Sequence, residues 1–140
     1  MMQRKRNGFN EKAVYDAVEH ALHGDTNIAV YRMNTGAAKV ADRFIRFGVP
    51  GQSDFTGIVK EIRCPICNRL TGAGVRLEIE CKAPDGRLTE HQKTWIAKIK
   101  EMNGIAIVFK PKTVEELFAM NVRKFIGNEI YKPCVKCDRS

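Results

Sequence analysis

The alternating stretch at residues 75–82 is the feature that most constrains how this chain can fold. Apolar and charged side chains alternate along it, in the order Val75, Arg76, Leu77, Glu78, Ile79, Glu80, Cys81 and Lys82. A period of two predicts a β-strand with one buried face, because successive side chains of a strand point to opposite sides. On the charged side, Glu80 and Lys82 would lie roughly 7 Å apart along the strand. A carboxylate that can bind a metal would therefore lie beside an ammonium group.

A second carboxylate precedes the strand that is predicted just upstream. Asp54 ends a loop that begins near Pro50, and residues 55–62 follow it as a mostly apolar strand. If this strand is the neighbour of residues 75–82 in the sheet, one divalent ion can contact both Asp54 and Glu80. An aspartate followed on the next strand by Glu-x-Lys is typical of metal-dependent phosphodiesterases, in which the ion activates water for attack on phosphate. The pattern therefore predicts a phosphodiesterase site.

The remaining patterns predict helices flanking a mixed sheet. Asn10 is expected to cap a helix that ends before Gly24, and Thr89 caps a second helix, with Gln92 completing a capping box. A third helix is expected from Thr113. The other predicted strands are residues 27–32, residues around 44–47, and the continuously apolar residues 105–109, expected to be buried on both faces, with a turn at 34–36. This order predicts an α/β fold that forms a single domain over residues 1–140.

Four of the five cysteines fall into two Cys-x-x-Cys pairs. These pairs are Cys64 with Cys67 and Cys134 with Cys137. Each has the spacing of half a zinc ribbon, and a tetrahedral Cys₄ zinc site needs two such pairs to meet. We therefore expect a structural zinc that joins a hairpin insert, residues 63–74, to a C-terminal tail, residues 127–140. Disulfides and unliganded thiols are the alternatives. The fifth cysteine lies on the apolar side of its strand and is expected to pack rather than react.

The charge of the chain favours a polyanionic partner. The formal net charge is +8 over 140 residues, while 44% of the residues are hydrophobic, which is not the composition of a disordered tail. Nucleic acid is the commonest partner of a basic domain, and a basic protein without such a partner is the alternative. No apolar run approaches the roughly 18 residues of a membrane-spanning helix, and no signal peptide is recognisable. We expect an intracellular, cytoplasmic protein without a membrane partner.

In the order in which they occur, these motifs resemble a known nuclease family. The chain resembles the VRR-NUC domain (virus-type replication-repair nuclease) of the PD-(D/E)xK superfamily from about Glu11 to Phe118. The motifs that carry the resemblance are Glu11-x-x-Val14, residues 31–37 (YRMNTGA), residues 43–54 (RFIRFGVPGQSD), residues 78–82 (EIECK), residues 86–92 (GRLTEHQ) and the strand after Gly104. Each motif alone is short, but their order and spacing together are specific. The resemblance implies a restriction-endonuclease-like sheet flanked by helices.

The resemblance also implies the composition of the site. It implies a catalytic set of Asp54, Glu80, Lys82 and Gln92, with Glu11 contributed by the first helix. Mg²⁺ or Mn²⁺ would bind Asp54, Glu80 and the backbone carbonyl of Cys81, because these ions prefer oxygen ligands. The amine of Lys82 would orient the attacking water, and Gln92 would hold that water or Glu80.

Each of these side chains also has a purely structural interpretation. Glu80 and Lys82 can form a surface ion pair worth about 0–1 kcal/mol, and Asp54 can cap a turn. Gln92 can serve the capping box alone, and Glu11 can interact with the positive end of its helix dipole. For single residues these interpretations are the simpler ones. The joint order of the residues favours a catalytic site.

The function implied by the resemblance is metal-dependent endonucleolytic cleavage of DNA. Stand-alone members of the family resemble Holliday-junction resolvases in replication, recombination or repair, and act on branched DNA as homodimers. A two-fold dimer would present two sites to two strands. The cysteine pairs are additions to the minimal domain. The alternatives are a less selective flap or nicking nuclease and a non-catalytic, zinc-dependent nucleic-acid-binding module.

Overall fold

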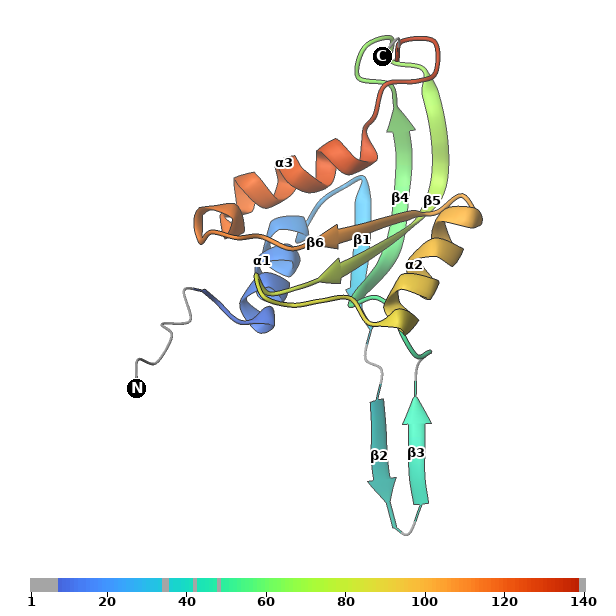
Figure 1. Cartoon of the computed structure of the whole chain (residues 1–140). Helices are drawn as coiled ribbons and strands as arrows, with labels where there is room; N and C mark the ends of the chain where they lie inside the picture. Colours follow the sequence, from blue (N-terminus) through green and yellow to red (C-terminus); the bar gives the residue numbers. More distant parts are fainter. Residues whose placement is uncertain (1–7, 34–35, 42, 48, 139–140) are drawn as a thin grey trace.

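Four strands form one mixed sheet in the order β1-β4-β5-β6 (Figure 1). The strands are β1 (Ile28–Arg32), β4 (Phe55–Arg63), β5 (Leu70–Cys81) and β6 (Ile105–Phe109). The pairs β1–β4 and β4–β5 are antiparallel, whereas β6 runs parallel to β5. The computed structural model describes residues 8–33, 36–41, 43–47 and 49–138, with the backbone alone for residues 36–40 and 44–47. Within these ranges, the chain is the predicted α/β arrangement of a mixed sheet and helices.

A second, two-stranded sheet is inserted between β1 and β4. It consists of β2 (Gly36–Val40) and β3 (Arg43–Phe47), which pair antiparallel and extend away from the main sheet (Figure 1). The sequence predicts β3 but not β2, because the residues of β2 do not alternate and are rich in glycine and alanine, which are uncommon in strands. Of the predicted turn at residues 34–36, the first two residues lie outside the described ranges.

Two helices cover one face of the main sheet and build the core with it. They are α1 (Glu11–Leu22) and α3 (Ala119–Ile130). Asn10 caps α1 as predicted, since its Oδ1 accepts a hydrogen bond from the N–H of Ala13 at 3.0 Å. Fully buried side chains meet in this layer, among them Val14 and Val18 of α1, Leu77 and Ile79 of β5, and Val122 and Ile126 of α3. Cys81 is buried in the same cluster, which confirms its predicted packing role.

The third helix, α2 (Glu90–Glu101), lies on the opposite face of the sheet, beside β5 and β6 (Figure 1). Beneath it lie charged side chains from the end of β5 and from Lys82, the residue that follows the strand. Glu78, Glu80 and Lys82 are 0%, 2% and 7% exposed. The sequence predicts only one buried face for this strand, which is wrong for its C-terminal half. The helix that buries the second face follows later in the chain, so the alternation of the strand itself does not reveal it.

The region around the cysteine pairs is more regular than predicted. β4 continues to Arg63 and β5 begins at Leu70, so the hairpin tip is residues 64–69 rather than an insert over 63–74. Gly72 and Gly74, which the sequence pattern places at the end of a loop, lie within β5. Likewise α3 continues to Ile130, so the tail begins after this residue and not at Gly127. Both predicted boundaries fail because glycine is tolerated inside a strand or helix that tertiary contacts hold in place.

The predictions for the last two elements need correction. In β6 only Ile107 and Phe109 are buried, because this strand lies at the edge of the described sheet. Thr113 does not cap α3. A short 3₁₀ helix, η1 (Glu115–Leu117), precedes it, and Glu116 accepts a hydrogen bond from the N–H of Lys112 at 2.5 Å instead. None of the helices in the described ranges is long and apolar enough to span a membrane.

Candidate active site and metal centres

Three carboxylates from different elements converge where β4 begins and β5 ends. Glu11 opens α1, Asp54 directly precedes β4, and Glu80 is the penultimate residue of β5. One carboxylate oxygen from each lies within 4.8 Å of the others. The structure thus brings together the three acidic residues that the sequence analysis singles out.

Strand register explains why Asp54 meets β5 at this point. Phe55 lies opposite Ile79, so the residue before Phe55 reaches the end of β5. The N–H of Cys81 donates to Asp54 Oδ2 at 2.7 Å, and the N–H of Met33 donates to the Asp54 carbonyl at 2.8 Å. The carboxylate of Asp54 is therefore held by the backbone of β5, and its backbone carbonyl by the residue that follows β1. The predicted metal contact of the Cys81 carbonyl stays a prediction.

Glu80 is held by the two other predicted residues. Gln92 Nε2 donates to Glu80 Oε1 at 2.9 Å, and Lys82 Nζ lies 3.6 Å from the same oxygen. The orientation of the Gln92 amide is set by the capping box, because its Oε1 accepts from the N–H of Thr89 at 2.9 Å. Only 9% of the Lys82 side chain is exposed. The predicted catalytic set thus forms one connected cluster, in which Glu80 and Lys82 are buried, Asp54 and Gln92 are half-buried and Glu11 is exposed.

The electrostatics of the cluster favour binding of a cation. Burial, followed by the nearby negative charge of Asp54, raises the pKa of Glu80 to about 8, against the opposing effect of Lys82. Burial also raises the pKa of Asp54, although the hydrogen bond from the Cys81 N–H opposes this. Two carboxylates this close cannot easily both be ionised. A divalent cation would replace the proton that Glu80 otherwise keeps at neutral pH.

The donor set fits Mg²⁺ or Mn²⁺. Both are hard ions that prefer oxygen, and all three side chains of the cluster are carboxylates. In an octahedral site with bonds of 2.0–2.1 Å, opposite ligand oxygens lie about 4.2 Å apart. A cluster whose oxygens all lie within 4.8 Å of one another is close to that size. One ion can therefore be shared by Glu11, Asp54 and Glu80.

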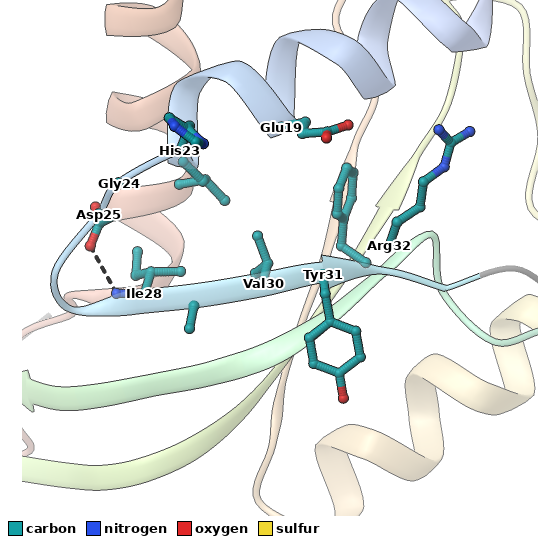
Figure 2. A pocket seen from close by; sticks show the side chains of 11 residues that line it. Glu19, His23, Gly24, Asp25, Ile28, Val30, Tyr31 and Arg32 are labelled. Carbon is teal, nitrogen blue, oxygen red and sulfur yellow. Dashed lines mark hydrogen bonds between the residues drawn. The ribbon is translucent and has the colours of Figure 1, made fainter.

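An arginine beside the cluster was missed by the sequence analysis. The Arg32 guanidinium carbon lies 4.1 Å from the centroid of the Tyr15 ring, and this ring packs against Phe55 at 4.5 Å. Figure 2 shows Arg32 at the end of β1, at one side of a pocket of about 320 Å³ beneath α1. Its charge opposes the upward pKa shift of Asp54. The sequence does indicate that Tyr15 lies near the cluster, because Tyr15 is four residues after Glu11 and so lies on the same face of the helix.

The four paired cysteines form a second cluster at the far tip of β4 and β5. The sulfur atoms of Cys64, Cys67, Cys134 and Cys137 all lie within 4.8 Å of one another. The Sγ atoms of Cys67 and Cys134 are 3.6 Å apart. Four sulfurs placed 2.3 Å from a tetrahedral zinc would be separated by about 3.8 Å. The hairpin tip and the tail therefore meet, as predicted, in a geometry that could hold zinc.

Local turns shape this cysteine cluster. The Cys64 carbonyl accepts from the N–H of Asn68, and the Cys134 carbonyl accepts from the N–H groups of Cys137 and Asp138. Asn68 has a φ of 62°, which closes the first turn. The N–H of Cys134 donates to Cys64 Sγ at 3.3 Å, and this hydrogen bond, followed by that from the backbone of Cys67, lowers the pKa of the thiol to about 6. Thiolates are the form that binds zinc.

The functional interpretation rests on these two clusters. The sequence matches no protein-family model, and no curated protein is significantly similar to it.

Proposed function

We propose that this protein is a Mg²⁺- or Mn²⁺-dependent endonuclease of the restriction-endonuclease-like type, related to the VRR-NUC branch of the PD-(D/E)xK superfamily. One observation carries the proposal: Glu11, Asp54 and Glu80 converge from three elements, with Lys82 and Gln92 against Glu80. An ion pair or a helix cap would explain one or two of these side chains. Neither explains why five polar side chains gather at one end of the sheet.

The chain would divide the chemistry among these residues. A bound Mg²⁺ or Mn²⁺ would neutralise charge on the scissile phosphate and lower the pKa of water. Glu11, Asp54 and Glu80 would hold the ion, and Gln92 would keep the Glu80 carboxylate in place. The ammonium of Lys82 would donate a hydrogen bond to the attacking water or a phosphate oxygen, offsetting charge that develops in the transition state.

Arg32 would add a contact to the substrate. Its planar guanidinium matches the geometry of a phosphate, and the Tyr15 ring beneath it limits its motion. Among the described residues it makes no salt bridge. It would therefore be free to bind a phosphate next to the one that is cut.

The proposed substrate is DNA, with branched DNA preferred. The net charge of +8 favours a polyanion, since neutralising phosphates releases counterions. A junction-resolving homodimer in replication, recombination or repair is the preferred form, on the resemblance in sequence. A flap or nicking nuclease is the alternative among enzymes. A non-catalytic zinc module is disfavoured, because it would not need the carboxylate cluster.

A substrate panel tests the proposal. Four-way junction, flap, nicked duplex and linear duplex are incubated with Mg²⁺ or Mn²⁺ and the wild type, Asp54→Asn or Asp16→Asn. Asp16 is the matched control because its carboxylate is exposed and forms an ion pair with Lys12 at the surface. We expect metal-dependent cleavage by the wild type and Asp16→Asn, and none by Asp54→Asn.

Three other outcomes of this panel would overturn parts of the proposal. Binding without metal-dependent cleavage would favour the non-catalytic module. Equal cleavage of junction and linear duplex would rule out a resolvase. Cleavage that survives Asp54→Asn would remove the carboxylate cluster from the mechanism.

A further inference from the structure

Within the described ranges, no helix covers one part of the sheet surface. α2 lies beside β5 and β6, and on the same face of β1 and β4 the side chains of Tyr31 and Ile58 are 64% and 56% exposed. Residues opposite each other on antiparallel strands share a face, and Tyr31 lies opposite Thr56, while Ala29 lies opposite Ile58. Figure 2 shows Tyr31 projecting from the side of β1 opposite to Val30 and Arg32. We call this surface the open face.

The open face is continuous with the carboxylate cluster. Thr56 Oγ1 donates to Glu78 Oε1 at 3.0 Å, and Glu80 is the next residue on that side of β5. Tyr31 and Glu80 are separated by two strand spacings and by about two residues along the strands. From the usual sheet dimensions this is roughly 12 Å between their backbones. A short run of nucleotides cut at the cluster would therefore pass over the open face.

The charge of the open face suits a polyanion. Lys60 is exposed two residues after Ile58, and Arg76 lies opposite Ile58 with 52% of its side chain exposed. The described residues of β1 and β4 on this face include no acid, and Glu78, the acid opposite Thr56 on β5, is fully buried and paired with Arg76 at 2.8 Å. The solvent-facing part of the surface thus combines an aromatic ring, an aliphatic side chain and two cations.

We propose that the open face binds the bases of an unpaired nucleic-acid strand, so that the substrate carries single-stranded nucleotides next to the phosphate that is cut. Bases stack on exposed aromatic rings, while neighbouring cations contact the backbone. In a duplex both faces of each base are already stacked, which leaves no surface for Tyr31. The placement of the nucleic-acid strand relative to the cut phosphate rests on the proposed function. The stacking of its bases on Tyr31 does not depend on that function.

Fluorescence quenching tests this stacking directly. A single-stranded oligonucleotide and a duplex with a single-stranded arm, each with 2-aminopurine at unpaired positions, are titrated with the full chain in Ca²⁺. The variants are Tyr31→Phe, which keeps the ring, and Tyr31→Ala, which removes it. Phe118→Ala is the matched control, because that aromatic residue is 56% exposed, close to the 64% of Tyr31, but lies at the start of α3.

We expect quenching by the wild type, Tyr31→Phe and Phe118→Ala. Tyr31→Ala should lose the quenching and bind single strands about tenfold more weakly, the scale of one lost base stack. Its affinity for plain duplex should change less than twofold. Equal behaviour of Tyr31→Ala and Phe118→Ala would overturn the proposal. So would a change in oligomeric size on gel filtration without a change in strand affinity, since the open face would then contact a second copy.

Parallel cleavage assays separate this proposal from the proposed function. If Tyr31-dependent stacking occurs but no substrate is cut, the nuclease assignment fails and the open face stands. If DNA is cut equally by the wild type and Tyr31→Ala, the nuclease assignment stands and the open face fails.

Discussion

Gln92 shows that the structural and the functional interpretation of a residue can both hold. Its Oε1 accepts from the N–H of Thr89 and so caps α2, while its Nε2 donates to Glu80. The cap therefore fixes the orientation of the amide that positions a metal-binding carboxylate. Glu11 combines two roles in a similar way, because it lies in the first turn of α1 and also in the carboxylate cluster. At these positions the sequence offers alternatives that the structure combines.

Replacing Lys82 by methionine should separate catalysis from folding. Methionine keeps most of the length of the side chain but removes the charge that lies 3.6 Å from Glu80. We expect cleavage to fall at least ~100-fold, the scale of losing a positioned catalytic group, with DNA binding and folding nearly unchanged. Single-turnover cleavage and urea unfolding measure the two effects. Lys12→Met is the control, because that lysine is also ion-paired but exposed. Normal turnover by Lys82→Met would remove the amine from the mechanism.

The raised pKa of Glu80 predicts how stability and metal binding depend on pH. The unfolded chain loses this proton near pH 4.5, whereas the folded chain keeps it up to about pH 8. Glu80 should therefore make the metal-free protein less stable as pH rises through this window. Binding of Mn²⁺ requires the carboxylate, so its affinity should rise over the same window, with release of a proton.

Glu80→Gln is the matched variant for this pH dependence, because it has the same shape and no proton to lose. Thermal unfolding from pH 5 to 8.5, with and without Mn²⁺, is compared between the two proteins. The wild type should lose stability relative to Glu80→Gln as pH rises without metal, and should recover it with Mn²⁺. Parallel pH profiles of the two proteins would contradict this prediction.

At the residue scale, the sequence predicts the set of site residues better than their surroundings. Asp54 and Glu80 could be found because consecutive strands are usually neighbours, and the alternation of β5 places Lys82 on the side of Glu80. The burial of Glu78 and the stacking of Arg32 on Tyr15 could not be predicted from the sequence. Both depend on which helix packs over which strand, and alternation within one strand carries no information about that.

At the scale of elements, helix starts with a side-chain cap were predictable. Asn10 and Thr89 cap α1 and α2 because the hydrogen bond lies within four residues of sequence. The start of α3 was not predictable. Phe118 begins it without a side-chain cap, and of the Thr113 and Glu116 pattern, Thr113 precedes the 3₁₀ helix η1 while Glu116 lies within it. Elements whose limits depend on tertiary contacts were the ones predicted with the wrong boundaries.

The cap of α2 can be tested with two threonines of the same region. Thr89→Ala removes the acceptor for the Gln92 N–H and should lower the free energy of unfolding by about 1 kcal/mol. Thr94 lies inside α2, where its hydroxyl bonds the Glu90 carbonyl, so Thr94→Ala should be neutral or slightly stabilising. Urea unfolding measures both changes. Thr89→Ala should also slow cleavage, because Gln92 is then less firmly placed. Equal stability of the two variants would show that the cap contributes nothing.

At the scale of the whole molecule, β4 and β5 connect two clusters of different chemistry. The carboxylate cluster lies where β4 begins and β5 ends. The cysteine cluster lies at the other end of the two strands, where the hairpin tip that joins β4 to β5 meets the C-terminal tail. Ten residues of β5 separate Leu70 from Glu80, which is roughly 33 Å. Oxygen donors select Mg²⁺ or Mn²⁺, and thiolates select zinc. Each cluster should therefore bind its own metal without competition from the other.

Zinc at the tip should stabilise the tail without supporting catalysis directly. Protein purified without chelator should contain about one zinc per chain by elemental analysis, since four thiols fill a tetrahedral site. Cys67 is exposed, so Cys67→Ser removes a ligand without opening a cavity. This variant should lose zinc, and its melting temperature should fall because the chain after Ile130 loses its link to β4. The affinity of the carboxylate cluster for Mn²⁺ should stay within about twofold, because its ligands lie at the other end of the sheet.

Ile66→Ser is the matched control for the zinc site. This side chain lies between the two cysteines of the hairpin tip and is 67% exposed, but it offers no thiolate. It should therefore keep both zinc and the wild-type melting temperature. If the wild type contains no zinc, or if Cys67→Ser keeps it, the four thiols do not act as one metal site. Loss of Mn²⁺ binding by Cys67→Ser would show instead that the tip and the carboxylate cluster are coupled through β4 and β5.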